Sequence, residues 1–450
     1  MTQLNFYGFG EPMIQDLTCR KLTTIVIYAL GTGGDIDPMV ALGIELLRRG
    51  YSVSFLSNDY FQPRIVAAGC EFISVGTLEQ YHQGNSVTAW EPRNHADNFE
   101  HYHAPAFEPA FNYVKSLVDT NALVLALGEE NGARVAAEKC NIPFIKMILS
   151  PNLIFSAYSP PAPMKWAIPA SIPRFIVRFL LRRNRKTRFN VFCRMQHNAA
   201  YLATRERLQC PLVFQAESAA ILQIGFFPEW FGMPAKDWPK NLKLVGFPLQ
   251  NRASMNSRTE LDAFIEQQGA PLIFTSGTGV KDVAKLFAEG RKICEYLQLP
   301  GLFVGGASGA ELLQGSSLCL HLNYIDFEYA LSKALAIIHH GGMGTTAQAI
   351  KAGIPQLIRP IKYDQPDNAD RIYQLGLGTY VMPEKFKAEQ VAPMIANMLQ
   401  KAKKSKALRY YSADVSNSSA IVNACDLVEQ VVKKLEMELT RLTGKVVAHS

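Results

Sequence analysis

The sequence predicts an α/β protein with two domains, each built on a doubly wound parallel sheet. Three observations favour this class. The length of 450 residues exceeds what one hydrophobic core usually organises. A β-branched apolar run at 24–30 is followed by a glycine turn, a helical pattern and a second apolar run at 52–57. The same order of strand, glycine-rich turn, helix and strand recurs between Leu335 and Ile358.

The composition is that of a globular protein with a mild basic excess. Apolar residues make up 48% of the chain and charged residues 19%, which suffices for buried cores. The formal net charge of +7 favours anionic ligands or an acidic surface, but it is too small to require nucleic acid. We therefore expect no nucleic-acid partner.

The cysteines and the N-terminus bear on the compartment. The eight cysteines are scattered without a CxxC pair, which argues against a disulfide framework or a zinc site and for a reducing compartment. Residues 1–20 contain Glu11 and Asp16 and no uninterrupted apolar segment, so no signal peptide is expected. No apolar run reaches the roughly eighteen residues that a spanning helix needs. We expect a cytoplasmic protein, either free or peripheral on the inner face of the membrane.

The first domain opens with a strand, a turn, a helix and a strand. Thr24–Leu30 predicts a buried parallel strand. Pro38 stands where a helix can begin, and the apolar spacing from Met39 to Arg49 fits a helix that Gly50 ends. Ser52–Ser57 predicts the second strand. Further strands are predicted at 123–127, 144–149 and 221–227, with a helix over 132–140.

The glycine turn after the first strand matches a dinucleotide fingerprint only in part. Gly31, Gly33 and Gly34 are present, but Ile36 stands where the third glycine of the fingerprint belongs. Asp35 would place a negative charge beside a pyrophosphate. We therefore disfavour an NAD-dependent oxidoreductase.

Four histidines lie in an irregular polar-aromatic stretch, 77–111. Their spacing suits no standard zinc site, and no cysteine or acid pair completes one. We predict that they lie on loops or helix surfaces, and the open alternative is that one of them touches an acceptor. They are His82, His95, His101 and His103.

The segment 174–188 contains seven basic residues and no acidic one. Its apolar residues Phe175, Ile176, Phe179 and Leu180 share one helical face. Two interpretations stay open. The segment is either a helix docked on its own domain with a solvated basic end, or an interfacial amphipathic helix that binds an anionic membrane surface.

The second domain has two strands that end in glycine turns. Residues 271–275 form the first strand, and Ser276, Gly277 and Thr278 follow it. The second strand, 335–338, leads into a glycine-rich turn and a helix from Thr345 to Ala352, which Gly353 and Pro355 end. The first turn of such a helix presents free amides and a partial positive charge, so it should bind phosphate.

The stretch from Ala336 to Gly378 resembles the donor-binding signature of family 1 glycosyltransferases with the GT-B fold. It is similar in particular to the branch of bacterial rhamnosyltransferases, sterol glucosyltransferases and antibiotic glycosyltransferases. The match is specific here and modest at Gly31 to Asp35. The matching residues are His340-Gly341-Gly342, Gly344-Thr345, Ala352-Gly353-Ile354-Pro355, Pro360, Asp364-Gln365, Asn368-Ala369 and Gly376.

The resemblance implies two Rossmann-like domains that face each other across a cleft, with a last helix that crosses back to the first domain. We divide the chain accordingly into a tail (1–20), an acceptor-binding domain (21–235), a linker (236–260), a nucleotide-sugar-binding domain (261–418) and the crossing helix with its tail (419–450).

The resemblance also implies a role for each matched position. Asp35 would be the catalytic base, although an aspartate there can also cap the following helix. The DxD spacing of Asp35 and Asp37 is used by metal-dependent enzymes of another fold, but these residues would face the wrong end of the site for the diphosphate. The acceptor loop would include Gly33 and Gly34, the donor sugar would contact Asp364 and Gln365, and the nucleobase would contact Tyr324 and Ile325. The diphosphate would contact Ser276, Gly277, Thr278, His340, Gly342, Met343, Gly344 and Thr345.

These assignments predict an inverting glycosyltransferase that needs no metal and no further cofactor. It would move a hexose or deoxyhexose, rhamnose-like or glucose, from a UDP- or dTDP-sugar to a hydroxyl of a hydrophobic small molecule or lipid. The sequence around Asp364-Gln365-Pro366 is closer to the rhamnosyl and antibiotic-sugar branch, which hints at a dTDP-deoxysugar. The alternatives are another GT-B enzyme, such as a nucleotide-sugar epimerase, and a catalytically inactive nucleotide-sugar binding protein.

Overall fold

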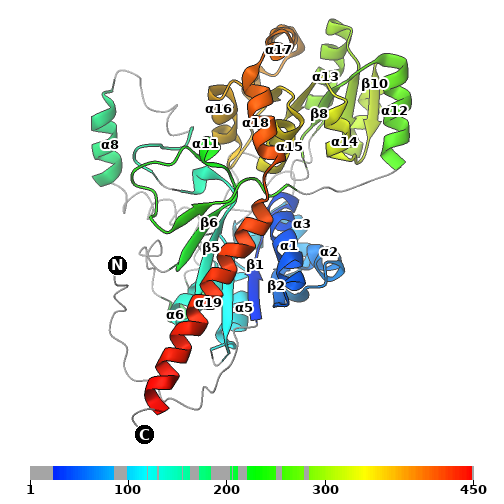
Figure 1. Cartoon of the computed structure of the whole chain (residues 1–450). Coiled ribbons are helices and arrows are strands. Elements are labelled where there is room, and N and C mark those ends of the chain that lie inside the picture. The colour runs from blue at the N-terminus through cyan, green and yellow to red at the C-terminus, as the bar shows by residue number, and fades with distance from the viewer. Residues whose placement is uncertain are drawn as a thin grey trace.

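Two α/β domains form the chain, one above the other in Figure 1. This is a computed structural model. It describes residues 24–85, 99–118, 120–128, 131–154, 156–162, 172–183, 203–204, 206–210, 220–249, 256–277 and 283–447.

The first domain contains a parallel sheet of seven strands in the order β3-β2-β1-β4-β5-β6-β7. Successive side chains of β1 enter different cores, Ile25 and Ile27 on one face and Val26 and Tyr28 on the other. Helices cover both faces, which explains why the strand is a continuous apolar run. The strands are β1 (Thr24–Tyr28), β2 (Ser52–Asn58), β3 (Glu71–Gly76), β4 (Ala122–Leu127), β5 (Phe144–Ile148), β6 (Leu222–Gly225) and β7 (Leu242–Leu244).

The second domain repeats this plan with six parallel strands in the order β10-β9-β8-β11-β12-β13. In each sheet the chain winds outward in one direction and then in the other, so a switch point separates β1 from β4 and β8 from β11. The predicted doubly wound α/β class is therefore confirmed. The strands are β8 (Leu272–Thr275), β9 (Gly301–Val304), β10 (Cys319–Leu322), β11 (Ala336–His339), β12 (Gln356–Ile358) and β13 (Gly378–Tyr380).

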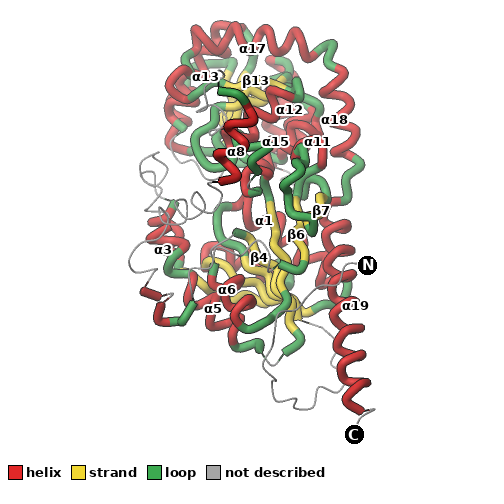
Figure 2. The backbone as a smooth tube through the Cα atoms, turned by 90° about the vertical axis from the view of Figure 1, so that its left-hand side faces the viewer, coloured by secondary structure: helices red, strands yellow, loops and turns green. Residues whose placement is uncertain are grey.

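Helices connect the strands and flank the sheets, as the tube in Figure 2 shows. Within the described ranges, none combines the length and apolar character that crossing a membrane requires. In the first half the helices are α1 (Gly33–Arg48), α2 (Gln62–Ala67), α3 (Leu78–Gly84), α5 (Phe107–Lys115), α6 (Gly132–Lys139), α8 (Arg174–Arg183) and α11 (Glu229–Gly232). The second half has α12 (Asn256–Gln268), α13 (Ala284–Leu297), α14 (Phe327–Ser332), α15 (Met343–Ala352), α16 (Gln365–Gln374), α17 (Ala388–Ala402), α18 (Lys406–Ser416) and α19 (Ala420–Val447).

Part of the segment predicted as a linker belongs to the first sheet. Strand β7 lies inside 236–260 and pairs in parallel with β6. It has only three residues between Trp238-Pro239 and Gly246-Phe247-Pro248, so no apolar run marked it as a strand. The prediction of a linker was wrong for these residues.

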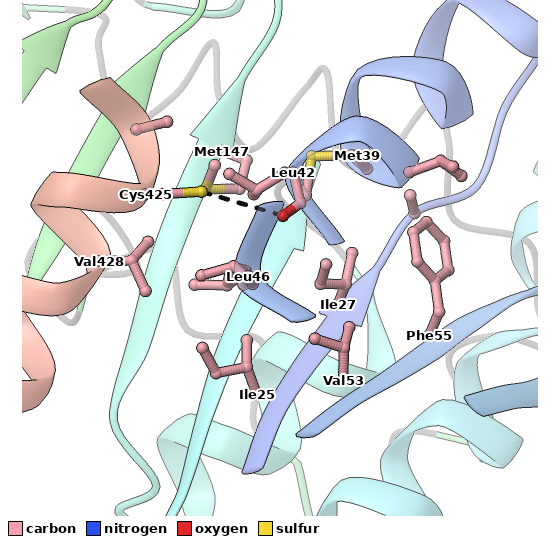
Figure 3. Packing of buried hydrophobic residues seen from close by; sticks show 14 of the residues in the cluster. Ile25, Ile27, Met39, Leu42, Leu46, Val53, Phe55, Met147, Cys425 and Val428 are labelled. Carbon is pink, nitrogen blue, oxygen red and sulfur yellow. Dashed lines mark hydrogen bonds between the residues drawn. The ribbon is translucent and has the colours of Figure 1, made fainter. Parts of the chain in front are cut away.

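The last helix, α19, packs along α1 of the first domain. Ala424, Cys425 and Val428 lie in the same buried core as Leu42 and Leu46 of α1, and Figure 3 shows this packing. At the surface the Arg49 guanidinium meets Asp426 at 2.7 Å and Glu429 at 3.2 Å. A chain that has just completed the second domain is thereby fixed to the first.

A second set of contacts joins the domains through α16. Its Arg371 side chain is buried and donates from Nη1 to the carbonyls of Phe231 and Gly232, at 2.7 and 3.0 Å. The same guanidinium donates from Nε to Asp367 Oδ2 at 2.7 Å. Asp367 Oδ1 in turn accepts a bond from the Ala162 amide of the first half at 2.9 Å. These polar groups are paired with each other inside the domain junction.

We predict that Arg371→Leu lowers the free energy of unfolding by about 3 kcal/mol or more, because it leaves the buried Asp367 carboxylate without its charged partner. A urea titration followed by tryptophan fluorescence measures the loss. Arg48→Leu is the control, because it removes an exposed ion pair with Glu45, and no measurable change is expected there. Equal stability of the two variants would contradict the role of Arg371.

Candidate functional site

The topology brings three glycine-containing turns to the carboxyl ends of the central strands. One follows β1 in the first sheet, and the other two follow β8 and β11, on either side of the second switch point. Ligands of open α/β sheets bind at such switch points. The side chains of these three turns are therefore the first candidates for a ligand-binding site.

The turn after β1 holds the Asp35 carboxylate in a defined position. Its Oδ2 accepts bonds from the Thr32 amide at 2.8 Å and from the Thr32 hydroxyl at 3.3 Å. A Cβ at Gly31, where φ is +142°, would lie 2.2 Å from this oxygen, so only glycine leaves room for the carboxylate. Burial raises the pKa of Asp35, and the bonds from Thr32 oppose that rise.

Helix α1 begins earlier than predicted. It starts at Gly33, so Pro38 lies inside the helix and Asp35 lies in its first turn. Thr32 and Asp35 form a capping box, which starts the helix ahead of the proline. The capping role that the sequence left open for Asp35 is thus observed. Gly33 and Gly34 lie in the same first turn.

Asp37 has a different partner from Asp35. Its carboxylate pairs with the Arg64 guanidinium of α2 at 2.5 Å, within the first domain. The two acids of the DxD pattern are therefore held by different partners, Thr32 and Arg64. Within the described residues no group of three or more histidine, cysteine, aspartate or glutamate side chains is arranged to hold a metal ion.

Tyr102 holds the turn after β1 through two hydrogen bonds to Gly31. Its hydroxyl accepts a bond from the Gly31 amide at 3.3 Å and donates one to the Gly31 carbonyl at 3.0 Å. The side chain is 1% exposed and comes from a π-helical turn, Phe99–His103. Both polar groups of Gly31 are thus bonded to one phenol, which fixes the backbone next to Asp35.

The turn after β11 distinguishes its two histidines. His339 is buried, with Nε2 bonded to Gln356 Oε1 at 2.9 Å and Nδ1 accepting the Gly341 amide at 3.1 Å. His340 is partly exposed, and its Nδ1 has no hydrogen-bond partner in the described chain. Burial lowers its pKa to about 4, so the ring is neutral at pH 7.

Two glycines make room for the His340 ring. A Cβ at Gly277 would lie 2.3 Å from His340 Cε1, and a Cβ at Gly342 would lie 2.5 Å from its Nε2. Gly277 also has a φ of +71°, which other residues rarely adopt. The ring therefore lies between the β8 turn and the β11 turn and joins them into one surface. Ser276 of the β8 turn is buried, and Thr278 lies outside the described residues.

Helix α15 points its N-terminus into this surface. It begins at Met343, two residues before the predicted start, with Gly342 as N-cap. The amides of Met343, Gly344 and Thr345 belong to the first turn and have no acceptor within the helix. Gly344 is exposed, and Met343 and Thr345 are partly exposed. These amides are open to an anionic ligand.

Asp364, Gln365 and Asn368 follow β12 and close the other side. Asn368 Nδ2 donates to the Gly341 carbonyl at 2.9 Å and to Asp364 Oδ2 at 2.8 Å. Gln365 Oε1 accepts the amides of Ile361 and Lys362, so its oxygen is used inside the loop. Asp364 stands at the start of α16 and is partly exposed.

Asp35 and Asp364 act on each other across the two domains. Burial raises the pKa of Asp364 to about 7, the bond from Asn368 opposes this, and the negative charge of Asp35 raises it further. The same charge contributes to raising the pKa of Tyr363 to about 12. The charge of the first-domain turn therefore affects the titration of groups in the loop that carries Asp364.

The predicted nucleobase contacts differ from each other. Tyr324 is 45% exposed after the end of β10, where an aromatic ring is open to a ligand. Ile325 is 1% exposed and packs in the core with Leu302 and Ile337. Its side chain is therefore closed to a base, and only its backbone could contribute.

The four histidines of the stretch 77–111 differ in their exposure. His82 and His101 are exposed, which agrees with the predicted surface positions, and His95 lies outside the described residues. His103 is partly exposed, and burial lowers its pKa to about 4.

Comparison with known families covers both halves of the chain. Residues 25–159 match the glycosyltransferase family 28 N-terminal domain. Residues 320–436 match the C-terminal domain of the erythromycin biosynthesis protein CIII-like family. The chain belongs to the family 1 glycosyltransferases with the GT-B fold, in their antibiotic branch. Both matched regions contain turns of the candidate site.

Curated relatives agree with this membership. Glycosyltransferase GtfC of Amycolatopsis orientalis is 24% identical over 383 residues, which cover 79% of this chain and 85% of the relative. O-mycaminosyltylonolide 6-deoxyallosyltransferase of Streptomyces fradiae is 26% identical over 198 residues, 43% of this chain and 46% of the relative.

Two solved structures show the same fold. The calicheamicin glycosyltransferase CalG4 superposes with a TM-score of 0.64 at 17% identity, covering 91% of this chain and 98% of its own. The glycosyltransferase VinC, solved in complex with dTDP, gives 0.60 at 15% identity, covering 92% and 100%. The predicted GT-B fold is confirmed.

Sequence reasoning missed several residues that build this glycosyltransferase site. Tyr102 lies 71 positions from Gly31, and no local pattern connects them. Asn368 was noted only as a matching position, although it ties Gly341 to Asp364. The i, i+4 spacing of Asp367 and Arg371 was an available signal for an ion pair.

The raised pKa of Asp364 predicts a pH dependence of stability. Between the ordinary pKa of 3.8 and about 7, the folded chain keeps a proton that the unfolded chain releases. The contribution of this group to the free energy of unfolding therefore falls as pH rises through that window. Asp364→Asn removes the titration, so we expect the variant to lose less stability than the parent between pH 5 and pH 8.

Thermal unfolding at a series of pH values measures this difference. Glu311→Gln serves as the control, because Glu311 is exposed, and its profile should follow the parent. Parallel profiles for Asp364→Asn and the parent would show that Asp364 is not held in the protonated form.

Proposed function

We propose that this glycosyltransferase transfers a hexose or deoxyhexose from a UDP- or dTDP-sugar to a hydroxyl group, with inversion and without a metal. The proposal is supported by the electrostatic coupling between Asp35 of the first domain and Asp364 of the second, whose loop Asn368 ties to the anion-binding turn. A base from one domain and a leaving-group site in the other fit a single displacement at the anomeric carbon.

The donor diphosphate would lie against the N-terminus of α15. Amides of Met343, Gly344 and Thr345, the Thr345 hydroxyl and the His340 ring would stabilise the charge that develops on the leaving diphosphate. Several preorganised donors aimed at one anion can replace a divalent cation in this task. Transfer should therefore survive a chelator.

Asp35 would remove the proton of the acceptor hydroxyl as its oxygen attacks the anomeric carbon. The new bond joins the acceptor oxygen to that carbon, the bond from the carbon to the diphosphate oxygen breaks, and the proton moves to Asp35. Attack from the face opposite the leaving group inverts the anomeric centre. Burial, which raises the pKa of Asp35, makes it a stronger base than a solvated aspartate.

The sugar and the base would be held by the loops that flank the diphosphate. Asp364 and Gln365 would bond the sugar hydroxyls, and the exposed Tyr324 would stack on the nucleobase. A dTDP-deoxysugar agrees with the complex of VinC with dTDP and with the 6-deoxyallosyl group named for the Streptomyces fradiae relative. The acceptor would be a hydrophobic small molecule or a lipid.

We predict that Asp35→Asn lowers the transfer rate by about a hundredfold to ten-thousandfold, because asparagine can still accept the Thr32 amide but cannot take a proton. Binding of the donor diphosphate should be kept. Asp37→Asn is the matched control, since its carboxylate is paired with Arg64, and it should stay near the parent rate. An Asp35→Asn enzyme as fast as the parent would overturn the mechanism.

A thermal-shift panel of UDP, dTDP and GDP with their sugars tests the donor. We expect UDP or dTDP compounds to raise the unfolding temperature. If none does, the donor proposal fails. Product analysis without an acceptor separates the alternatives, since an epimerase would convert the nucleotide sugar alone and an inactive binding protein would bind it without any reaction.

Tyr102→Phe should slow transfer by roughly tenfold while the KM for the donor stays the same. The reason is that the loss of both bonds to Gly31 loosens the backbone that positions Asp35 without touching the α15 turn. Steady-state kinetics over a range of pH measure the change. Tyr410→Phe, which alters an exposed tyrosine, is the control. A rise in donor KM alone would contradict this positioning role.

A further inference from the structure

Helix α8 turns its apolar face to the solvent. Phe175 is 70% exposed, Phe179 61% and Leu180 48%, although α8 is part of a folded domain. Figure 1 shows the helix standing apart from both sheets. Exposed apolar patches of this kind mark contact surfaces. The sequence left open whether this face docks on its own domain, and in the structure it does not.

The opposite side of α8 contacts the protein. Leu181 is 2% exposed, and the Arg178 guanidinium lies 5.1 Å from the centroid of the Tyr158 ring. The helix is therefore placed with one side inward, and its exposed apolar stripe is the outward side.

The segment that α8 contacts is fixed to both domains. Ser156 Oγ and the Ala157 amide donate to the Asp237 carboxylate at 2.6 and 2.8 Å. A few residues later the Ala162 amide donates to Asp367 of α16. Since α16 begins next to Asp364, the exposed face of α8 is joined through a short bonded segment to the helix that borders the candidate site.

We propose that α8 binds an anionic phospholipid bilayer through its exposed face. The positive charge of the helix favours an anionic bilayer as the partner. The ten residues of α8 include four arginines and no acidic residue, and the exposed apolar residues lie within the same helix. Aromatic and aliphatic side chains that enter the lipid interface, with arginines at the headgroups, are the composition of an interfacial helix. The surface would place the enzyme where a hydrophobic acceptor resides.

Vesicle co-sedimentation tests the proposal with the full chain and no sugar donor. The parent should bind vesicles that contain phosphatidylglycerol and leave vesicles of pure phosphatidylcholine unbound, and the binding should weaken as salt rises. Because the assay uses no donor, its failure would leave the proposed transfer standing, and failed transfer would leave this binding intact.

Two pairs of variants separate the apolar and the charge contributions. Phe175→Ser with Phe179→Ser should weaken binding by about tenfold or more, because two exposed rings no longer enter the interface. Arg182→Gln with Arg183→Gln should weaken it by about twenty-five-fold, since each basic residue contributes roughly fivefold. The matched controls are Val66→Ser with Val118→Ser, at exposed apolar sites elsewhere, and Lys403→Gln with Lys404→Gln, with the same loss of charge. Both controls should bind like the parent.

Four results would overturn the proposal. The parent could fail to bind anionic vesicles, or it could bind neutral ones equally well. The phenylalanine variant could keep parental binding while remaining folded by circular dichroism. Sedimentation equilibrium could show a dimer that the phenylalanine substitutions dissolve, which would assign the face to a second copy of the chain.

Discussion

The buried polar side of α16 is the constraint on which the site depends. Arg371 reaches the carbonyls of Phe231 and Gly232, and Asp367 accepts both the guanidinium and the Ala162 amide. Buried polar groups are costly unless all of them are bonded, so this set is satisfied only in one arrangement of the two domains. Because α16 starts beside Asp364, that arrangement also sets where Asp364 lies relative to Asp35. The apolar cluster that contains Phe231, Phe247 and Ile372 fills the junction around it.

In the second-domain turns, glycines without a side chain leave room for the His340 ring. Gly277 and Gly342 have no Cβ, so the His340 ring can lie against both backbones. Burial keeps this ring neutral, with its pKa lowered to about 4. In the absence of a ligand, the positive potential of the turn therefore comes from the amides of α15 rather than from an imidazolium. A bound diphosphate would favour the protonated ring, because an adjacent anion raises the pKa of a histidine.

The sequence predicts those elements whose pattern lies within a few neighbouring residues. Apolar runs bounded by glycines located the central strands, because a strand buried on both faces has few polar residues. The α15 helix was predicted within two residues, since Gly353 ends it in a left-handed conformation. Three-residue strands such as β7 gave no run to detect, and the start of α1 depended on the capping box between Thr32 and Asp35 rather than on Pro38.

The candidate site was predictable only where a residue's role comes from its own motif. His340 and Asp364 belong to one dense stretch, and the resemblance there was specific. Asn368 and Tyr102 act through bonds to backbone groups that are distant in sequence, and a single sequence contains no trace of such pairs. Ile325 shows the opposite error, because an apolar residue beside an exposed tyrosine suits a ligand contact and a core position equally well.

One rigid element connects the chemistry to the exposed surface. Asn368 of α16 holds Asp364 and the Gly341 carbonyl, and Asp367, one residue earlier, holds the segment that α8 contacts. The two side chains are adjacent on a helix that is mostly buried, so neither can shift without moving the other. The Ala162 amide donates to Asp367, and Asn368 donates to Asp364. The segment that α8 contacts and the loop that would hold the donor sugar are therefore both held by α16.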